Sequence, residues 1–311
     1  MWIQSDFQQY RFLLGYAFHQ PSFCPNVSWN DNATTLLTTS NIGDEIKNLF
    51  LDQNNTLYLV QEEPGAILIF YQGQTVPAHN LTSNLNKSIA VFVADNGDIY
   101  VDNGAKKGRV ERWTNYWNPT PVMFVPTSCR GLFIDNNNSL YCSLKDQELV
   151  LIKYLNDNAN TTRVVAGNGT CGPALNTLCD PYGMFVTENF NLYIADRNNG
   201  RVMLFQLGQI NGTAVAGNGS SVYLPLLKPT NVFVDADGYL YIADEGYHSI
   251  FRVRNNYYRC IAGCSGSSGS QAHQLDNPFQ MAFDSTGALI VLDEDNERIQ
   301  KFDILMNSCR K

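Results

Sequence analysis

The sequence predicts an all-β fold, a six-bladed β-propeller of four-stranded blades. Three observations predict it: a strand-type unit recurs, its copies lie 41 to 52 residues apart, and Asp, Asn and Gly fill its turns. Periods of about 40 to 50 residues of strand-type sequence are typical of propeller blades. We therefore expect residues 1–311 to form a single propeller domain.

The recurring unit is clearest in the second half of the chain, where residues 185–196 and 233–244 share one frame and both end in Tyr-Ile-Ala-Asp. Weaker copies keep a Phe with a Tyr eight residues later, and a degenerate sixth copy runs through 282–293. The blade anchors are Phe50, Phe92, Phe133, Phe185, Phe233 and Ala282.

Each unit reads as four strands. In the fifth blade they are 231–234, 240–243, 249–253 and 259–263, with an Asp-Ala-Asp-Gly turn that supplies the positive-φ positions a hairpin needs. The sixth blade ends after three strands, at 298–302. Residues 11–15 fit the outer-strand template and are predicted to complete this blade, which would close the ring and remove an open sheet edge.

Taken together, these residues resemble the NHL-repeat family of six-bladed β-propellers. The motifs that carry the resemblance are Leu-Tyr-Ile-Ala-Asp at 192–196 and 240–244 and Asn-Gly-Arg-Val at 199–202, with weaker versions at 108–110 and 297–299. The resemblance implies the fold but little about function, because such propellers host binding, scaffolding and a few enzymatic roles.

Cysteine and asparagine usage predicts a secreted glycoprotein. The eight cysteines form no Cys-x-x-Cys pair, and an even count favours disulfides. Residues 1–24 show no signal peptide, and an Asn-rich composition alone would also raise the number of acceptor triplets. The glycosylation candidates are Asn26, Asn32, Asn54, Asn80, Asn86, Asn137, Asn160, Asn168, Asn211 and Asn218.

Eight cysteines allow about 105 pairings, so connectivity is an expectation from blade position. Proximity within one loop, strand end or hairpin favours three of the bonds, and a fourth would lock the ring closure. The expected pairs are Cys129–Cys142, Cys171–Cys179, Cys260–Cys264 and Cys24–Cys309.

Charge and hydropathy exclude two classes of partner. Lys and Arg number 21 against 29 Asp and Glu, a net charge of −8, which argues against nucleic acid because phosphate binding needs clustered bases. No stretch approaches the roughly 20 apolar residues that cross a bilayer, so we expect no membrane insertion.

Two motifs are interpreted as structural. Residues 167–172 match G-x-G-x-x-G, but Pro173 follows where a phosphate site needs a helix. Asp196, Asp244 and Asp293 end second strands, where they are expected to accept backbone N–H groups and, in two blades, to pair with Arg201 and Arg298.

An enzymatic alternative remains open. Related propellers include peptide-amidating lyases, whose histidine set is absent here, and lactonase-like hydrolases, which hold a central calcium with acidic and amide side chains. Asn231 could be one such ligand, although Gln280 and Gly183 at equivalent positions complete no charged shell. We expect no cofactor, and calcium-dependent lactonase or esterase activity at the central channel is the alternative.

The loops between second and third strands form the predicted binding face, with acids in blades 5, 6 and 1 and bases in blades 2, 3 and 4. None of the acceptor triplets falls in these loops, so the face is expected to be free of glycans. A partner with charges complementary to this face would be held in one orientation. We therefore expect a secreted, non-catalytic binding or scaffold module that recognises a protein or glycan. The candidate binding residues are Glu62, Glu63, Lys106, Lys107, Lys145, Arg197, Glu245, His248, Glu294 and Asp295.

Overall fold

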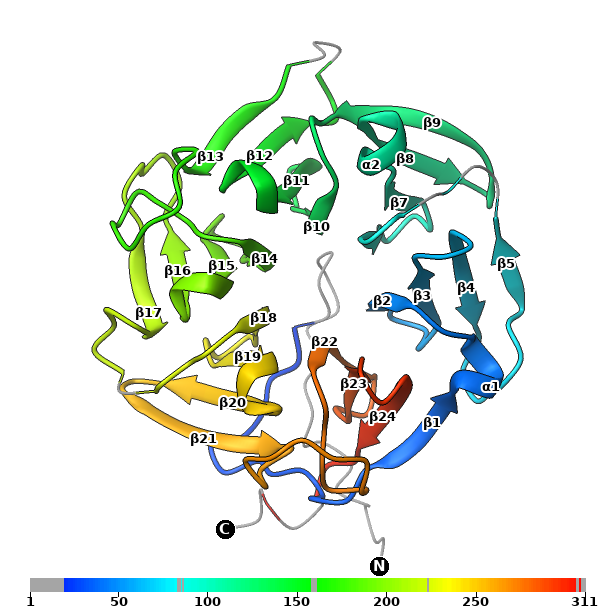
Figure 1. The fold of residues 1–311 in the computed structure, drawn as a ribbon, viewed down its shortest axis with the longest axis vertical. Coiled ribbons are helices and arrows are strands. Elements are labelled where there is room, and N and C mark those ends of the chain that lie inside the picture. Colours follow the sequence, from blue (N-terminus) through cyan, green and yellow to red (C-terminus); the bar gives the residue numbers. More distant parts are fainter. Residues whose placement is uncertain are drawn as a thin grey trace, which may run out of the picture.

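The fold is a ring of six four-stranded antiparallel sheets around a central axis, which confirms the predicted six-bladed propeller (Figure 1). A computed structural model describes residues 20–82, 85, 87–157, 161–222, 224–305 and 308, apart from the side chains of 105, 106 and 117. Within them, no helix is both long and apolar enough to span a membrane.

Blades 1 to 5 are meanders of sequential strands, and blade 6 combines three C-terminal strands with the N-terminal β1. Blades 1 and 2 consist of β2 (Ile46–Leu51), β3 (Leu57–Gln61), β4 (Ala66–Phe70), β5 (His79–Leu81), and β6 (Val91–Val93), β7 (Ile99–Asp102), β8 (Arg109–Thr114), β9 (Trp117–Phe124). Blades 3 and 4 consist of β10 (Cys129–Ile134), β11 (Ser139–Leu144), β12 (Leu149–Tyr154), β13 (Arg163–Gly167), and β14 (Pro181–Val186), β15 (Leu192–Asp196), β16 (Arg201–Phe205), β17 (Thr213–Gly217). Blades 5 and 6 consist of β18 (Pro229–Val234), β19 (Leu240–Asp244), β20 (Ser249–Arg254), β21 (Tyr257–Ala262), and β22 (Pro278–Phe283), β23 (Leu289–Asp293), β24 (Arg298–Phe302), β1 (Thr34–Thr38).

The first strand of each blade lies next to the axis and the fourth lies at the rim (Figure 1). Short helical turns follow some strands: α1 (Thr39–Ile42), α2 (Gly104–Lys107), η1 (Lys145–Gln147), η2 (Arg197–Asn199) and η3 (Glu245–Tyr247). Because the strands alternate in direction, the loops after second and fourth strands share one face, here the loop face. The hairpins after first and third strands share the other, the hairpin face.

The predicted hairpin chemistry holds at the turns between first and second strands in five blades, and in blade 4 Phe190 takes the left-handed position with φ +58°. In blade 5, Gly238 adopts φ +80° and its N–H donates to the carbonyl oxygen of Asp235 at 3.0 Å. Asn138 fills the same place in blade 3 with φ +58°. Glycine and asparagine are used here because a left-handed residue is needed to match the strand twist.

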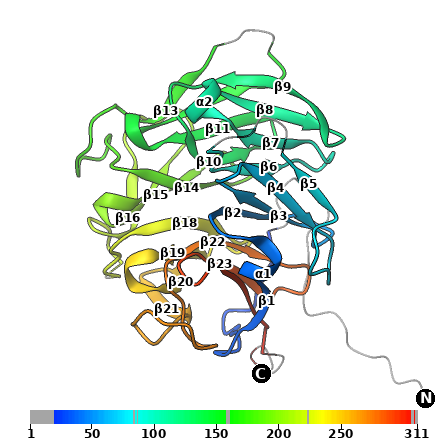
Figure 2. The ribbon, with the colours of Figure 1, turned by 45° about the vertical axis from the view of Figure 1, so that its right-hand side comes forward.

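The closing strand was predicted at the wrong place. β1, not residues 11–15, pairs antiparallel with β24 and completes blade 6, and residues 11–15 themselves lie outside the described residues. The principle of closure by an N-terminal strand is confirmed, as Figure 2 shows with blue β1 beside the last blade. β1 buries only Leu37, so its sequence carries little of the apolar pattern by which a strand is recognised.

Three of the four expected disulfides are confirmed, Cys129–Cys142 between β10 and β11, Cys171–Cys179 within one loop, and Cys260–Cys264 at the end of β21. Cys24 is also disulfide-bonded, and Cys309, the partner expected for it, lies outside the described residues.

The aspartates that end second strands accept backbone N–H groups and pair with the two arginines, as expected, but most of these N–H groups belong to the preceding interblade loop. Asp196 accepts the N–H of Cys179 and the Nε–H of Arg201, both at 2.6 Å. Asp293 accepts the N–H of Asp276 and the Nε–H of Arg298, again at 2.6 Å. Asp244 instead accepts the backbone N–H groups of 227, 228 and 247, and no ion pair of Asp244 occurs among the described residues. These carboxylates therefore connect each of these blades to the loop that comes from the preceding blade.

Candidate functional site

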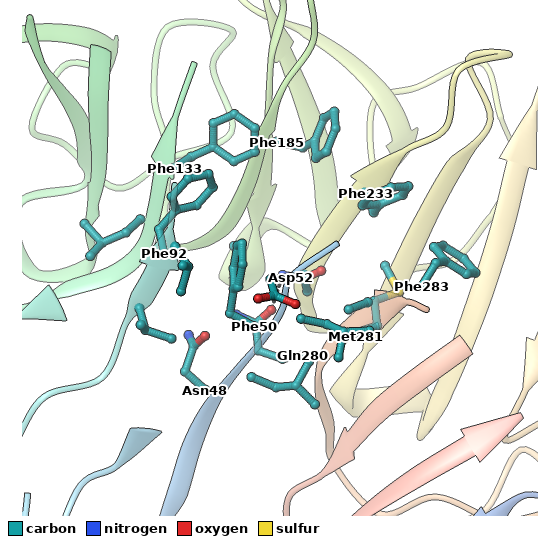
Figure 3. A pocket seen from close by; sticks show the side chains of 18 of the residues that line it. Asn48, Phe50, Asp52, Phe92, Phe133, Phe185, Phe233, Gln280, Met281 and Phe283 are labelled. Carbon is teal, nitrogen blue, oxygen red and sulfur yellow. Dashed lines mark hydrogen bonds between the residues drawn. The ribbon is translucent and has the colours of Figure 1, made fainter. Parts of the chain in front are cut away.

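The six inner strands surround an axial pocket of about 770 Å³, which Figure 3 shows from close by. Every blade contributes to its lining, mostly through apolar side chains. Ligand pockets of soluble proteins typically enclose about 300 to 1,000 Å³ and combine such a lining with a few polar groups. The axial pocket is therefore the candidate binding site.

Phenylalanine side chains form one layer of the pocket wall. The five phenylalanines that mark the repeats occupy one position of the first strand, and each is opposite the Tyr of its second strand. Neighbouring rings lie 4.9–5.3 Å apart, centroid to centroid, mostly edge to face. The wall residues are Phe50, Phe92, Phe133, Phe185 and Phe233.

The wall is interrupted at blade 6. Ala282 pairs with Ile290 at the register where Phe233 pairs with Tyr241, so a methyl group replaces a ring at this position. The next residue, Phe283, packs against Phe233 at 5.3 Å and against Tyr241 at 4.8 Å. The ring of phenylalanines thus lacks a member at Ala282, between blades 5 and 1.

Polar side chains lie at both ends of the apolar wall. Asn48, Asn231 and Gln280 line the pocket near the starts of the inner strands, and Asn231 donates its amide N–H to Gln280. Asp52, Asp95 and Asp284 lie at the hairpin face, and the Asp284 carboxylate is paired with Lys301 at 2.9 Å. Amides and carboxylates could thus orient the polar parts of a ligand whose apolar part contacts the rings.

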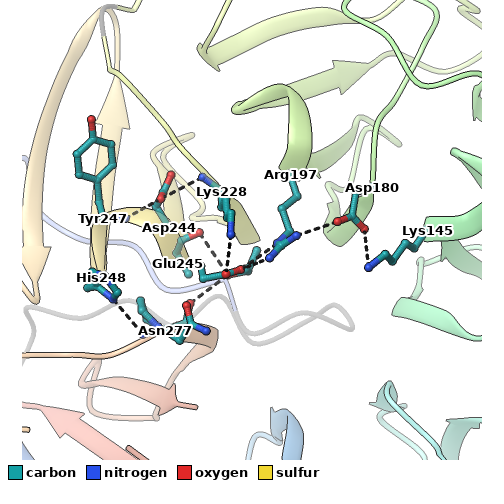
Figure 4. A network of polar contacts seen from close by, with 12 residues as sticks. Lys145, Asp180, Arg197, Lys228, Asp244, Glu245, Tyr247, His248 and Asn277 are labelled. Atoms are coloured by element: carbon teal, nitrogen blue, oxygen red, sulfur yellow. Dashed lines mark hydrogen bonds and ion pairs between the residues drawn. The ribbon is translucent and has the colours of Figure 1, made fainter. Parts of the chain in front are cut away.

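Several predicted binding residues meet in one ion-pair network on the loop face (Figure 4). Arg197 lies between Asp180, 2.8 Å from its Nη1, and Glu245, 2.9 Å from its Nε. Lys145 approaches Asp180 at 3.8 Å, and Lys228 approaches Glu245 at 3.4 Å. Positive and negative side chains here neutralise one another.

The other predicted binding residues lie outside this network. Glu294 pairs with Lys47 at 2.8 Å; burial raises the pKa of Glu294, and Lys47 opposes that rise. His248 lies 3.2 Å from Asp276, and Asp295 is exposed. Lys107 pairs with Glu111 at 3.3 Å, and Glu63 lies 4.0 Å from Lys87. Glu62 is half-buried, and the side chain of Lys106 lies outside the described residues.

The loop face is not free of acceptor triplets, contrary to the prediction. Asn168 and Asn218 follow the fourth strands β13 and β17, whose ends lie on this face. Asn218 even contacts a loop between second and third strands, since its N–H donates to the carbonyl oxygen of Gly200 at 3.0 Å. The expectation overlooked that second and fourth strands end on the same face.

One group of potential metal ligands occurs among the described residues, formed by Glu148, Cys171 and Cys179. Its two sulfurs are bonded to each other in a disulfide, so neither is a thiolate. The group is a structural crosslink beside a carboxylate.

Fold and pocket together define a six-bladed propeller with an axial pocket lined by phenylalanines. No protein-family model matches the chain, and no curated protein matches it. Solved propeller structures are similar. One is a protein of unknown function from Bacteroides thetaiotaomicron, with 14% sequence identity and a TM-score of 0.70 over 88% of this chain and 76% of that one. Another is an auxiliary nutrient binding protein from the same species, with 15% sequence identity and a TM-score of 0.67 over 88% of this chain and 76% of that one.

A catalytically inactive virginiamycin B lyase from Staphylococcus aureus, solved with quinupristin, is also similar, at 13% identity and TM-score 0.61 over 85% of this chain and 82% of that one. At sequence identities this low, the structural similarity shows the propeller fold alone. Membership of the NHL-repeat family stays a prediction.

Proposed function

We propose that this protein is an extracellular, non-catalytic binding module that takes an apolar or aromatic group of its ligand into the axial pocket. The observation that carries the proposal is the wall of five phenylalanines around a pocket of about 770 Å³. Burying apolar surface contributes roughly 25 cal/mol per Å², so contact with such a wall is a sufficient source of affinity.

The axial pocket is favoured over the loop face because of where charge is already compensated. Arg197 and Glu245 are only 15% and 12% exposed, and each is engaged by an opposite charge of the same chain. A partner would have to break these ion pairs before using their charges. The auxiliary nutrient binding protein of similar fold supports a binding role for the propeller, and the partner remains a protein, a glycan or a smaller ligand with an apolar group.

The proposal is tested with N-phenyl-1-naphthylamine, a neutral aromatic dye whose fluorescence rises in apolar surroundings. We expect saturable binding to the wild type and at least about tenfold weaker binding to Ala282→Phe, since a sixth ring fills the gap in the wall. Phe50→Ser should weaken binding similarly by removing one ring. The matched control is Phe124→Ser, at a 52% exposed position on the outer strand β9, which should bind like the wild type.

Equal dye affinity in all four proteins would contradict the proposal, as would the absence of saturable binding to the wild type. Weaker dye binding to Ala282→Phe is not expected to result from misfolding, because five other blades accommodate phenylalanine at this strand position. Thermal melting of each variant establishes that it is folded.

The calcium-dependent hydrolase is the second candidate, favoured by the amide oxygens of Asn48, Asn231 and Gln280 in the pocket. Calcium prefers oxygen ligands, usually with several carboxylates. Calorimetric titration with calcium chloride separates the candidates: stoichiometric binding that is lost in Asn231→Ala supports the hydrolase, and no binding leaves the aromatic pocket as the site.

Exposure of the acceptor asparagines supports the extracellular part of the proposal. Eight of the ten lie in the described residues, and all eight are exposed; Asn86 and Asn160 lie outside them. Disulfides also persist mainly in oxidising compartments. We expect protein from a mammalian secretory host to lose several kilodaltons on treatment with peptide N-glycosidase; an unchanged mass would contradict glycosylation.

A further inference from the structure

A second cavity lies far from the axis, between the outer strands of blade 5 and the N-terminal segment. It encloses about 280 Å³ and is bordered by Arg252, Arg254 and Arg259 with Tyr239 and Tyr257. Its volume is near the lower end of the range for ligand sites, which suits a small charged group.

The three arginines are brought together by strand register. Arg252 and Arg254 alternate along β20, so their side chains share one face, and Arg259 on β21 is directly opposite Arg252. Like charges directly opposite each other destabilise a sheet. The pKa of Arg259 is accordingly lowered, mainly by burial and in addition by repulsion from Arg252.

Negative charge compensates this cluster only in part. Among the described residues, the one ion pair that any of the three arginines forms is between Arg252 and Asp235, at 3.7 Å. Asp235 is one carboxylate beside three guanidinium groups, and its Oδ2 also accepts the hydroxyl of Tyr241 at 3.0 Å. The cluster therefore carries an excess of positive charge next to a cavity.

Guanidinium donors in the cluster are unsatisfied. Arg252 is 2% exposed and donates one hydrogen bond, from Nη1 to the carbonyl oxygen of Pro25 at 2.9 Å. Its Nε and Nη2, and the Nη2 of Arg259, are buried without a hydrogen-bond partner in the described part of the chain. Leaving buried charged donors unpaired is costly, so a ligand that accepts from them would be bound favourably.

Tyr239 fixes the orientation of these donors. The Cζ atom of Arg252 lies 3.5 Å from the centroid of the Tyr239 ring, and that of Arg254 lies 4.6 Å from it. Stacking on an aromatic ring holds a planar guanidinium in place while its edge remains able to donate. Two guanidiniums are thus pre-positioned beside the cavity.

We propose that this cavity is a binding site for a tetrahedral oxyanion, a sulfate or phosphate ester group, held by Arg252, Arg254 and Arg259. Guanidinium groups bind such oxyanions through paired, charge-assisted hydrogen bonds. The site is independent of the axial pocket and of the function proposed for it.

The test is calorimetric titration of the full chain with sodium sulfate and with sodium phosphate, at an ionic strength held constant with sodium chloride. We expect binding of at least one oxyanion to the wild type and at least about tenfold weaker binding to Arg259→Gln. Arg163→Gln is the matched control, because Arg163 likewise lies on an outer strand, β13, but is opposite Ile152, and the variant should bind like the wild type. Tighter binding of sulfate would indicate a ligand with a sulfate ester, and tighter binding of phosphate would indicate a ligand with a phosphate ester.

Stability in the absence of oxyanion separates binding from a structural role. Arg259→Gln removes a like-charge pair and should unfold at the same temperature as the wild type or higher. No heat of binding with either anion, or equal affinities in wild type and Arg259→Gln, would overturn the proposal. A Tm of Arg259→Gln well below that of the wild type without oxyanion would also overturn it, since the arginine would then be a structural element.

Discussion

Replacing Trp29 by alanine is expected to destabilise the protein by about 3 to 5 kcal/mol, the range for truncating a large buried aromatic side chain. Trp29 is 3% exposed, and its Nε1–H donates to the carbonyl oxygen of Gly287 at 3.0 Å. Its ring packs against Phe23 at 5.3 Å and Phe283 at 5.8 Å. The side chain thus joins the N-terminal segment to blade 6, the blade that closes the ring.

Denaturant unfolding followed by fluorescence and circular dichroism measures this loss. Leu36→Ala is the control: Leu36 lies in the closing strand β1 but is 37% exposed, so its truncation should change the free energy of unfolding by less than about 0.5 kcal/mol. If Trp29→Ala cost no more than Leu36→Ala, the N-terminal segment would not be part of the closure.

Replacing Asp102 by asparagine is expected to remove a pH dependence of stability. Asp102 ends β7 and is fully buried; its Oδ1 accepts the N–H groups of Gly104 at 2.9 Å and Cys129 at 3.0 Å. Its Oδ2 has no hydrogen-bond partner among the described residues. Burial raises the pKa of Asp102 from 3.8 to about 7, because the charged form is poorly solvated there.

The direction of the effect follows from this rise. Between the two pKa values the folded state holds a proton that the unfolded state has released. The stabilisation is therefore fully present below about pH 4 and is lost as the pH rises through 7. A rise of this size corresponds to about 4 kcal/mol.

Denaturant unfolding between pH 4 and 8 measures the effect. The wild type should lose up to about 4 kcal/mol over this range relative to Asp102→Asn, whose side chain stays neutral. Asp146→Asn, which changes an exposed carboxylate, should follow the wild type. Parallel profiles for the wild type and Asp102→Asn would show that Asp102 is charged throughout the range.

Much of the fold could be predicted from the sequence because each blade repeats one pattern. The Phe and Tyr anchors mark first and second strands, and these strands are buried on both sides, so their pattern is strong. Even the exception was recognisable, since Ala282 does hold the Phe position. The closing strand was missed because β1 is an outer strand in which a single side chain is buried.

The candidate sites were harder to predict. The phenylalanines were interpreted as markers of the repeat, although a large ring at one fixed position of five of the six innermost strands already indicates an aromatic channel wall. The arginine cluster needs the register between β20 and β21, which places Arg259 opposite Arg252 and which a sequence does not state. Ion pairing across blades, as between Arg197 and Glu245, likewise depends on three-dimensional proximity.

The central claim, that the axial pocket binds an apolar group, is tested most directly by a crystal structure with 1-bromonaphthalene, whose bromine is located by anomalous scattering. We predict a bromine peak inside the ring of blades, beside Ala282 and between Phe50 and Phe233. Peaks confined to the outer surface at saturating ligand, or no peak at all, would contradict the claim.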